Sequence, residues 1–239
     1  MDSTAFGMLN SKLMQFSLTR QEATIYLCLM QNKELSGYEV SKITGISRSN
    51  VYSALAGLVE KGAAYLIEGS TNKYTAVPAE EFCQNKIRRL NQLKQEIVHE
   101  LPKINTDNEG YITISSHRHI MDKIATMLEN VAYRVYISMP PEYLMQFWKQ
   151  LEQLGAAGKK VVLLVESTLE KTPKDSIVYI THKTDRQLKL IVDSEYVLTG
   201  EMTGAETDTC LYCAQKNFVN VFKESLKNEI RLIELTGSI

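Results

Sequence analysis

One short stretch of the chain carries side chains suited to reading DNA. In "SRSNVYSALAGLVEKG" an apolar run at helical spacing follows a serine that can cap a helix. Arginine can fork onto guanine, asparagine can pair with adenine, and serine and tyrosine hydroxyls can hold phosphate. The predicted DNA-contacting residues of this helix are Ser47, Arg48, Ser49, Asn50, Tyr52 and Ser53.

The elements around this stretch follow the order of a winged helix-turn-helix. "LTRQEATIYLCLM" opens with a capping box at Thr19 and Glu22, and a short helix capped by Ser36 ends before Gly45. Gly45 tolerates the positive φ that a steep turn between two helices needs. "AAYLIEG" and "KYTAVP" then predict two strands joined by a polar turn, in which Lys73 could reach phosphate.

Ser36 and Lys73 therefore join the predicted DNA-contacting set. A helical hairpin in any α/β protein is the alternative, since residues 36–78 hold only four Lys and Arg against three Glu.

A long polar helix is predicted from Pro78 to about residue 104. Five apolar residues fit a and d positions of a heptad, with Lys94 at one a position. The stripe predicts a coiled-coil helix that links two copies of the chain, although it could instead pack on the protein's own body. The predicted dimerisation residues are Ile87, Leu90, Ile97, Leu101 and Ile104.

The pattern changes to short β-branched runs after the turn formers of "LPKINTDNEG". We therefore predict an α+β chain with a DNA-binding domain at 1–77, a linking helix at 78–105 and an α/β domain at 106–239. Ligands gather at the carboxyl ends of strands in such sheets. Ser138, Glu166 and His182 each lie at or just after a predicted strand end, which makes them candidate pocket residues, with ordinary caps and turns as the alternative.

The first half of the chain resembles the TrmB family of transcriptional regulators. The residues that carry this resemblance are "LTRQEATIYLCLM", "SGYEVSKITGISRSNVYSALAGLVEKGAA" and "KYTAVPAEEF". The resemblance implies double-stranded DNA as partner and a C-terminal, phospholipase D-like effector domain that binds a small molecule, often a sugar.

The phospholipase D reaction needs His-x-Lys followed by Asp after four further residues. The nearest counterpart here places Arg186 and Leu188 at the His and Lys positions and Asp193 at the Asp position. Without the histidine nucleophile we expect no catalysis. Arg186 and Asp193 join the predicted effector-binding set.

"CLYC" contains a lone Cys-x-x-Cys pair, Cys210 and Cys213. A structural zinc site needs two more ligands, for which His117 and His119 are the candidates. Buried small hydrophobic side chains are the simpler interpretation, and a redox-sensing pair is the other. We predict no metal site and no cofactor.

The overall composition fits a regulator that works in the cytoplasm. The net charge of −1 over 239 residues argues against coating of nucleic acid by bulk charge. We expect neither a secretory signal nor a membrane span. Two other functions stay open: a phosphodiesterase with a DNA-targeting domain, and an architectural DNA-binding module.

Overall fold

The computed structural model describes residues 3–102, 110–166, 171–181 and 186–236. The chain divides into two compact units, Met1–Lys103 and Ile104–Ile239. No helix in the described ranges is both long enough and apolar enough to cross a bilayer. The α+β fold class predicted from the sequence is confirmed.

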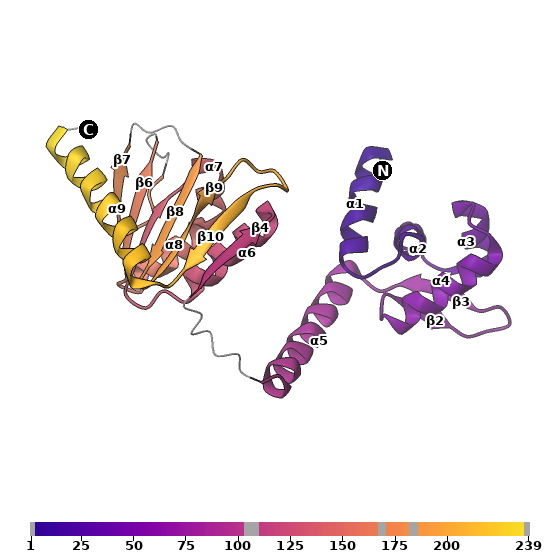
Figure 1. Cartoon of the computed structure of the whole chain (residues 1–239). Helices are drawn as coiled ribbons and strands as arrows, with labels where there is room; N and C mark the ends of the chain where they lie inside the picture. Colours follow the sequence, from indigo (N-terminus) through magenta and orange to yellow (C-terminus); the bar gives the residue numbers. More distant parts are fainter. Residues whose placement is uncertain (1–2, 103–109, 167–170, 182–185, 237–239) are drawn as a thin grey trace. The chain divides into compact units, whose positions relative to one another are not determined.

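The first unit is a helical domain with a small sheet (Figure 1). Its helices are α1 (Ser3–Gln15), α2 (Arg20–Gln31), α3 (Gly37–Thr44), α4 (Arg48–Glu60) and α5 (Ala79–Glu100). Its strands are β1 (Leu35–Ser36), β2 (Ala64–Ile67) and β3 (Lys73–Ala76), which pair antiparallel in the order β1-β3-β2. The two predicted wing strands are present, and β1 is a third strand that the sequence pattern did not reveal.

An ion pair joins the beginning of α2 to the end of α4. The capping box is formed, because Glu22 accepts from the Thr19 N–H and donates its own N–H to the Thr19 hydroxyl. The Lys61 ammonium also lies 2.6 Å from the buried Glu22 carboxylate. Burial alone would raise the pKa of Glu22, but Lys61 and Thr19 outweigh it and hold that pKa below its usual value.

The long helix is shorter than predicted. It ends at Glu100, and Leu101 is extended, with φ −76° and ψ 138°. Pro102 explains the end, because proline disfavours helical geometry in the residue before it. Leu101 therefore lies outside the helix, and Ile104 lies outside the described residues.

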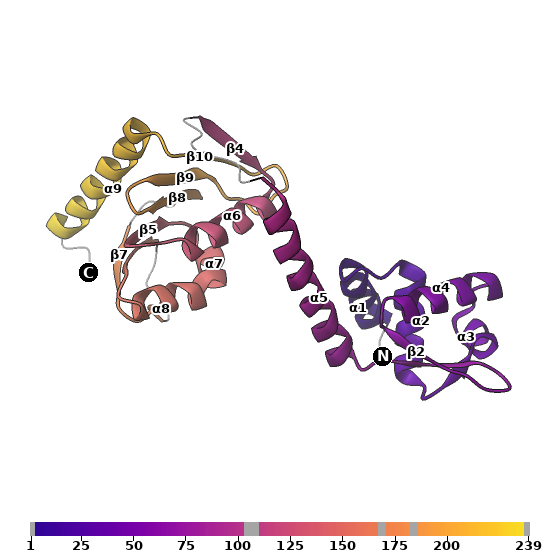
Figure 2. The same ribbon diagram turned by 90° about the horizontal axis from the view of Figure 1, so that it is seen from below.

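The second unit is a seven-stranded sheet, and helices cover both of its faces (Figures 1 and 2). Its strands are β4 (Tyr111–Ser115), β5 (Arg134–Ser138), β6 (Lys160–Val165), β7 (Ser176–Ile180), β8 (Gln187–Val192), β9 (Tyr196–Glu201) and β10 (Thr209–Cys213). Its helices are α6 (His117–Glu129), α7 (Pro141–Leu144), the 3-10 turn η1 (Met145–Phe147), α8 (Trp148–Ala156) and α9 (Lys216–Thr236). The short β-branched runs of the sequence form strands of this sheet, as predicted.

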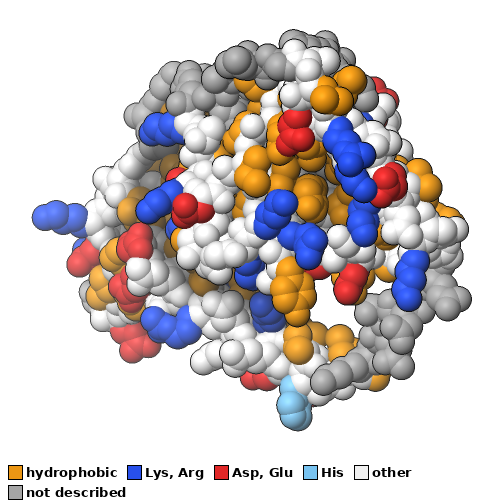
Figure 3. Space-filling model, turned by 90° about the vertical axis from the view of Figure 1, so that its left-hand side faces the viewer, with side chains coloured by type: hydrophobic (Ala, Val, Ile, Leu, Met, Phe, Trp, Pro, Cys, Tyr) orange, Lys and Arg blue, Asp and Glu red, His pale blue; other side chains and the backbone are white. Residues whose placement is uncertain are grey.

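The strand order is β4-β10-β9-β8-β5-β6-β7. β5, β6 and β7 are parallel, and the other neighbours are antiparallel. Along each strand, successive side chains point to opposite faces of the sheet. One face, which includes Ile137 and Leu163, packs on α6, α7 and α8, and the other, which includes Val162 and Leu164, packs on α9. Figure 3 looks onto the side that carries α9 and β7, where Lys and Arg side chains lie beside hydrophobic ones.

Candidate functional site

The turn between α3 and α4 has the predicted geometry. Gly45 ends α3 with φ +71°, a conformation that side chains with a Cβ rarely adopt. The Ser41 hydroxyl donates to the Ile46 carbonyl at 2.7 Å, which ties the end of α3 to the turn. Ser47 occupies the N-cap of α4 but makes no side-chain cap bond, and its hydroxyl lies 3.4 Å from that of Ser49. The cap position is thus as predicted, while the hydroxyl stays at the surface.

The two faces of α4 are sharply different. Val51, Ala54, Leu55 and Leu58 are buried in the core of the first unit. The polar residues predicted to contact DNA lie on the opposite, exposed face: Arg48, Ser49, Asn50, Tyr52 and Ser53. The packing of the apolar stripe therefore presents all of these side chains to solvent.

Tyr38 on α3 is a surface residue that the sequence pattern did not single out. The Arg48 guanidinium carbon lies 4.5 Å from the centre of the Tyr38 ring, and the Lys42 ammonium lies 5.5 Å from it. A cation over an aromatic face is attracted by the ring's quadrupole. Lys42 follows Tyr38 by four residues, so that contact could have been predicted from helical spacing. The Arg48 contact depends on the angle of the turn and could not.

Two predicted DNA-contacting residues are differently placed. Ser36 is buried, and its hydroxyl serves the capping box of α3 with Glu39, which removes it from the exposed surface. Lys73 is the first residue of β3 and not part of the turn, and its ammonium lies 3.6 Å from the Glu34 carboxylate. Both ends of that pair are half-exposed, so Lys73 remains at the surface.

The predicted stripe on α5 is exposed to solvent. Ile87, Leu90 and Ile97 are each 46–49% exposed, and Leu93 is 47% exposed beside them. Only Phe82, near the start of α5, is buried among the residues of this helix. Among the described residues of the first unit, nothing covers this stripe.

In the second unit, three of the predicted effector residues lie at the carboxyl ends of the parallel strands, which we call the carboxyl edge of the sheet. Ser138 ends β5 and Glu166 directly follows β6, which runs parallel to it. Arg186 precedes β8, which runs antiparallel to β5, so it lies at that same edge. His182 lies outside the described residues.

Asp193 cannot belong to that edge. It follows β8, a strand of six residues, which places it roughly 20 Å away at the opposite end of the sheet. Its carboxylate accepts the backbone N–H groups of Ala132, Tyr133 and Arg134 at 2.7–2.8 Å. Burial alone would raise its pKa, but these bonds lower it. Asp193 therefore anchors the start of β5 and does not share a pocket with Ser138, Glu166 and Arg186.

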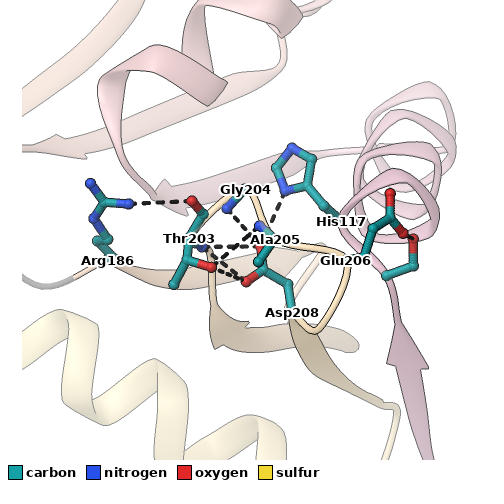
Figure 4. A network of polar contacts seen from close by, with 8 residues as sticks. His117, Arg186, Thr203, Gly204, Ala205, Glu206 and Asp208 are labelled. Atoms are coloured by element: carbon teal, nitrogen blue, oxygen red, sulfur yellow. Dashed lines mark hydrogen bonds and ion pairs between the residues drawn. The ribbon is translucent and has the colours of Figure 1, made fainter.

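A polar network at the carboxyl edge surrounds Asp208 (Figure 4). This buried carboxylate accepts the N–H groups of Thr203 and Gly204 and the Thr203 hydroxyl at 2.5–3.1 Å. The His117 Nδ1 atom lies 3.2 Å from the Asp208 carboxylate. Burial alone would raise the pKa of Asp208, but these contacts lower it, so the carboxylate stays ionised and suits a proton on Nδ1.

The network extends to neighbouring loops. The Arg186 guanidinium donates to the Thr203 carbonyl at 3.3 Å, and the Ser116 hydroxyl donates to Glu206 at 2.8 Å. The Tyr143 ring from α7 lies 4.8 Å from the His117 ring. The structure thus brings Arg186, His117 and Asp208 into one network. The sequence suggested His117 only as a zinc ligand, and it did not suggest Asp208 as a site residue.

The Cys-x-x-Cys pair lies on β10, where a spacing of three residues points the two side chains to opposite faces. Both cysteines are buried and free, and burial raises the pKa of the Cys210 thiol to about 12. In the ranges that the structure describes, no three or more His, Cys, Asp or Glu side chains gather as a metal site. These observations agree with the interpretation of both cysteines as small buried hydrophobic residues.

Arg186 and Leu188 stand where a phospholipase D enzyme has His and Lys. Leu188 is fully buried in the core of the second unit. It therefore offers no group to a substrate phosphate.

Two family models match the chain. The model described as sugar-specific transcriptional regulator TrmB matches residues 13–80. The model of the N-terminal subdomain of the TrmB effector-binding domain matches residues 110–230.

Individual relatives are more distant. The uncharacterized protein YrhO of Bacillus subtilis is 25% identical over 64% of this chain and 56% of its own length. The sugar-sensing transcriptional regulator TrmBL1 of Pyrococcus furiosus is 26% identical over 68% of this chain and 48% of its own. The chain thus spans about half the length of these curated relatives.

Two solved structures are distantly similar to the chain. The archaeal chromatin protein TrmBL2 is 19% identical, with a TM-score of 0.46, over 94% of this chain and 97% of its own. The phospholipase D family member Nuc from Salmonella typhimurium is 11% identical, with a TM-score of 0.39, over 51% of this chain and 94% of its own. No argument about function rests on similarities of this size. The family matches, which cover more than half of the chain, show that it belongs to the TrmB family of transcriptional regulators.

Proposed function

We propose that this protein is a sequence-specific DNA-binding regulator whose C-terminal domain binds a small-molecule effector. Residues 1–77 read the DNA, 78–105 link two copies, and 106–239 sense the effector. One observation carries the proposal: α4 exposes Arg48, Ser49, Asn50, Tyr52 and Ser53 directly after the Gly45 turn. In a helix-turn-helix protein the first turns of this second helix enter the major groove.

The polar face of α4 has the chemistry that base reading requires. Arg48 can form two parallel hydrogen bonds with guanine, and Asn50 can do the same with adenine. Ser47, Ser49, Tyr52 and Ser53 supply hydroxyls for phosphate and sugar, which fix the register but carry no sequence information. Lys73 on the wing supplies a charge for the phosphate backbone.

The test begins with selection of bound duplexes from a random DNA library by the full chain. Fluorescence anisotropy at moderate salt then compares a selected duplex with a scrambled one for the wild type, Arg48→Ala and Asn50→Ala. Each variant should lose about 1–3 kcal/mol of discrimination per base contact removed. Glu60→Gln, on the same helix, is the control that should bind as the wild type.

Unchanged discrimination in both Arg48→Ala and Asn50→Ala would refute the assignment of α4 as the recognition helix. Failure of the selection to enrich any sequence, with tight binding to all duplexes, would favour the architectural module instead.

The exposed stripe of α5 supports a homodimer. Ile87, Leu90 and Ile97 form an apolar surface on a helix of 22 residues, and a second copy would bury it. Two copies would present two α4 helices to a palindromic site. An effector that prefers one arrangement of the dimer would then change DNA affinity by the difference between its affinities for the two arrangements.

The effector site that we propose is the carboxyl edge of the second unit. Ser138, Glu166 and Arg186 lie there, and His117 adds a ring nitrogen, Nε2, whose partner nitrogen faces Asp208. These groups can donate to and accept from the hydroxyls of a sugar. A thermal-shift screen of sugars tests this proposal, because a ligand that binds only the native state raises its apparent stability. His117→Gln and Arg186→Gln should abolish the shift of any sugar found, and Lys149→Gln should not.

Two observations argue against a phosphodiesterase. The family that matches the chain consists of transcriptional regulators, and the chain lacks the His and Lys of the phospholipase D motif. Arg186 and the buried Leu188 stand in the positions of the nucleophile and its partner. Robust phosphodiesterase turnover that depended on Arg186 would contradict our proposal.

A further inference from the structure

A groove between α9 and the sheet gathers positive charge from α9, β5 and β6. Its volume is about 450 Å³, within the range of small-molecule sites. Five cationic side chains line it against two carboxylates, although the chain as a whole carries a net charge of −1. The lining cations are Arg134, Lys160, Lys223, Lys227 and Arg231. Figure 3 faces this side of the domain, where blue side chains surround an apolar hollow.

Cations lie next to other cations both on α9 and on the strands. Lys223, Lys227 and Arg231 follow one another at intervals of four residues on α9, and like charges at this spacing repel each other. Arg134 and Lys160 begin β5 and β6 and are direct neighbours in the parallel register. The structure therefore tolerates two sets of like charges, which point into one groove.

Both lining carboxylates already have partners. Glu224 lies 3.6 Å from Lys227, and Glu234 accepts a hydrogen bond from the Tyr179 hydroxyl at 2.9 Å. Among the residues that the structure describes, Lys227 is the only lining cation in an ion pair. The groove thus holds more positive charge than its own carboxylates balance.

The floor of the groove is aromatic and apolar. This floor is formed by four strands, which contribute Tyr136, Val162, Tyr179 and Ile191. The Lys160 ammonium lies 5.9 Å from the centre of the Tyr136 ring. A ligand with a compact organic body could lie on this floor while its charged groups reach the cations at the rim.

We propose that this groove is a binding site for a small phosphorylated metabolite. Arginine and lysine are the side chains that proteins use for phosphate, and arginine binds it through two parallel hydrogen bonds. Arg134 and Lys160 begin their strands, whereas Ser138 ends β5, so the groove lies toward the opposite end of the strands from the His117–Asp208 edge. It is a second site, separate from the proposed effector edge and independent of DNA binding.

Isothermal titration calorimetry on the full chain without DNA tests the proposal. The probes are fructose 1,6-bisphosphate, inorganic phosphate and fructose, at low ionic strength. The bisphosphate should bind, phosphate should bind at least tenfold more weakly, and fructose should give no heat at this site. Absence of any bisphosphate binding at millimolar concentration would overturn the proposal.

Matched variants distinguish binding in this groove from unspecific attraction to positive charge elsewhere on the surface. The double variant Lys223→Gln/Arg231→Gln should weaken bisphosphate binding at least tenfold. The control, Lys149→Gln/Lys174→Gln, removes the same charge from exposed positions outside the groove, and it should leave bisphosphate binding unchanged. Lys223→Arg keeps the charge and should retain binding, which controls for folding. Equal losses in the two double variants would show unspecific attraction and refute the site. Because no DNA is present, neither result bears on the proposed DNA binding.

Discussion

The Arg48 guanidinium lies 4.5 Å from the centre of the Tyr38 ring, so α3 and α4 share one cation–π contact at the exposed surface. This contact restricts an arginine that would otherwise sample many rotamers in solvent. Ordering such a side chain before binding lowers the entropy that binding must overcome. Tyr38 is therefore a positioning residue for the base contact that we assign to Arg48.

Tyr38→Leu should weaken binding to a selected duplex by about two- to fivefold, since an exposed cation–π contact contributes roughly 0.5–1 kcal/mol. Tyr38→Phe keeps the ring and should bind within a factor of two of the wild type. Fluorescence anisotropy measures both. Equal losses for the two variants would assign the effect to the hydroxyl and contradict a role through Arg48.

Lys73 should act on all DNA sequences alike. Lys73→Ala removes one phosphate contact, so the slope of log K against log salt should fall by about one. Glu34→Gln removes the partner carboxylate 3.6 Å away and should strengthen binding at low salt. Anisotropy titrations at several salt concentrations, on selected and scrambled duplexes, provide the measurement. A Lys73→Ala effect confined to one sequence would instead place this side chain at a base.

The α5 stripe should control the oligomeric state. Leu90→Glu places a charge among Ile87, Leu93 and Ile97 and should convert a dimer into a monomer in analytical ultracentrifugation. Gln92→Glu, an exposed residue on the other side of the helix, adds the same charge and should leave the dimer intact. A wild-type chain that sediments as a monomer would remove the dimer from our proposal.

The Glu22–Lys61 pair should make stability depend on pH. The pKa of Glu22 is lowered in the folded chain, so its contribution is fully present above the usual carboxyl pKa of 4.5 and is lost as pH falls through the lower, folded-state value. Urea unfolding between about pH 3 and pH 6 should show this loss in the wild type and a smaller one in Glu22→Gln.

Lys61→Met should lower the free energy of unfolding by about 1–3 kcal/mol at neutral pH, because it leaves the buried Glu22 carboxylate without its cation. Glu60→Gln alters an exposed neighbour of Lys61 and serves as the control. Identical pH profiles for the wild type and Glu22→Gln would show that other carboxylates govern the acid transition.

Local patterns predicted the first unit well because its geometry is set by neighbours in sequence. The capping boxes at Thr19 and Ser36 and the positive φ of Gly45 each depend on a few adjacent residues. The same local rule explains the main error, since Pro102 ends the helix before Leu101. The cap bond of Ser36 could be predicted from Glu39 three residues later, but its burial depends on the pairing of β1 with β3.

The second unit depends on contacts that no local pattern encodes. His117 and Asp208 are 91 residues apart, and only the pairing of β4 with β10 brings them together. Asp193 stands at a motif position, yet the direction of β8 carries it away from Arg186 to the far end of the sheet. The sequence predicts that strands exist, but their order decides which side chains meet.

β4 lies at the edge of the sheet and pairs with β10 alone. An edge strand can lose its hydrogen bonds by local unfolding while the other strands of the sheet stay paired. The next residue after β4, Ser116, donates its N–H to the Asp208 carbonyl, and His117 begins α6 directly after it. A pull on the chain that enters β4 would therefore load the Tyr111–Cys213 pair first and would reach the Ser116–Asp208 hydrogen bond, beside the proposed effector site, last.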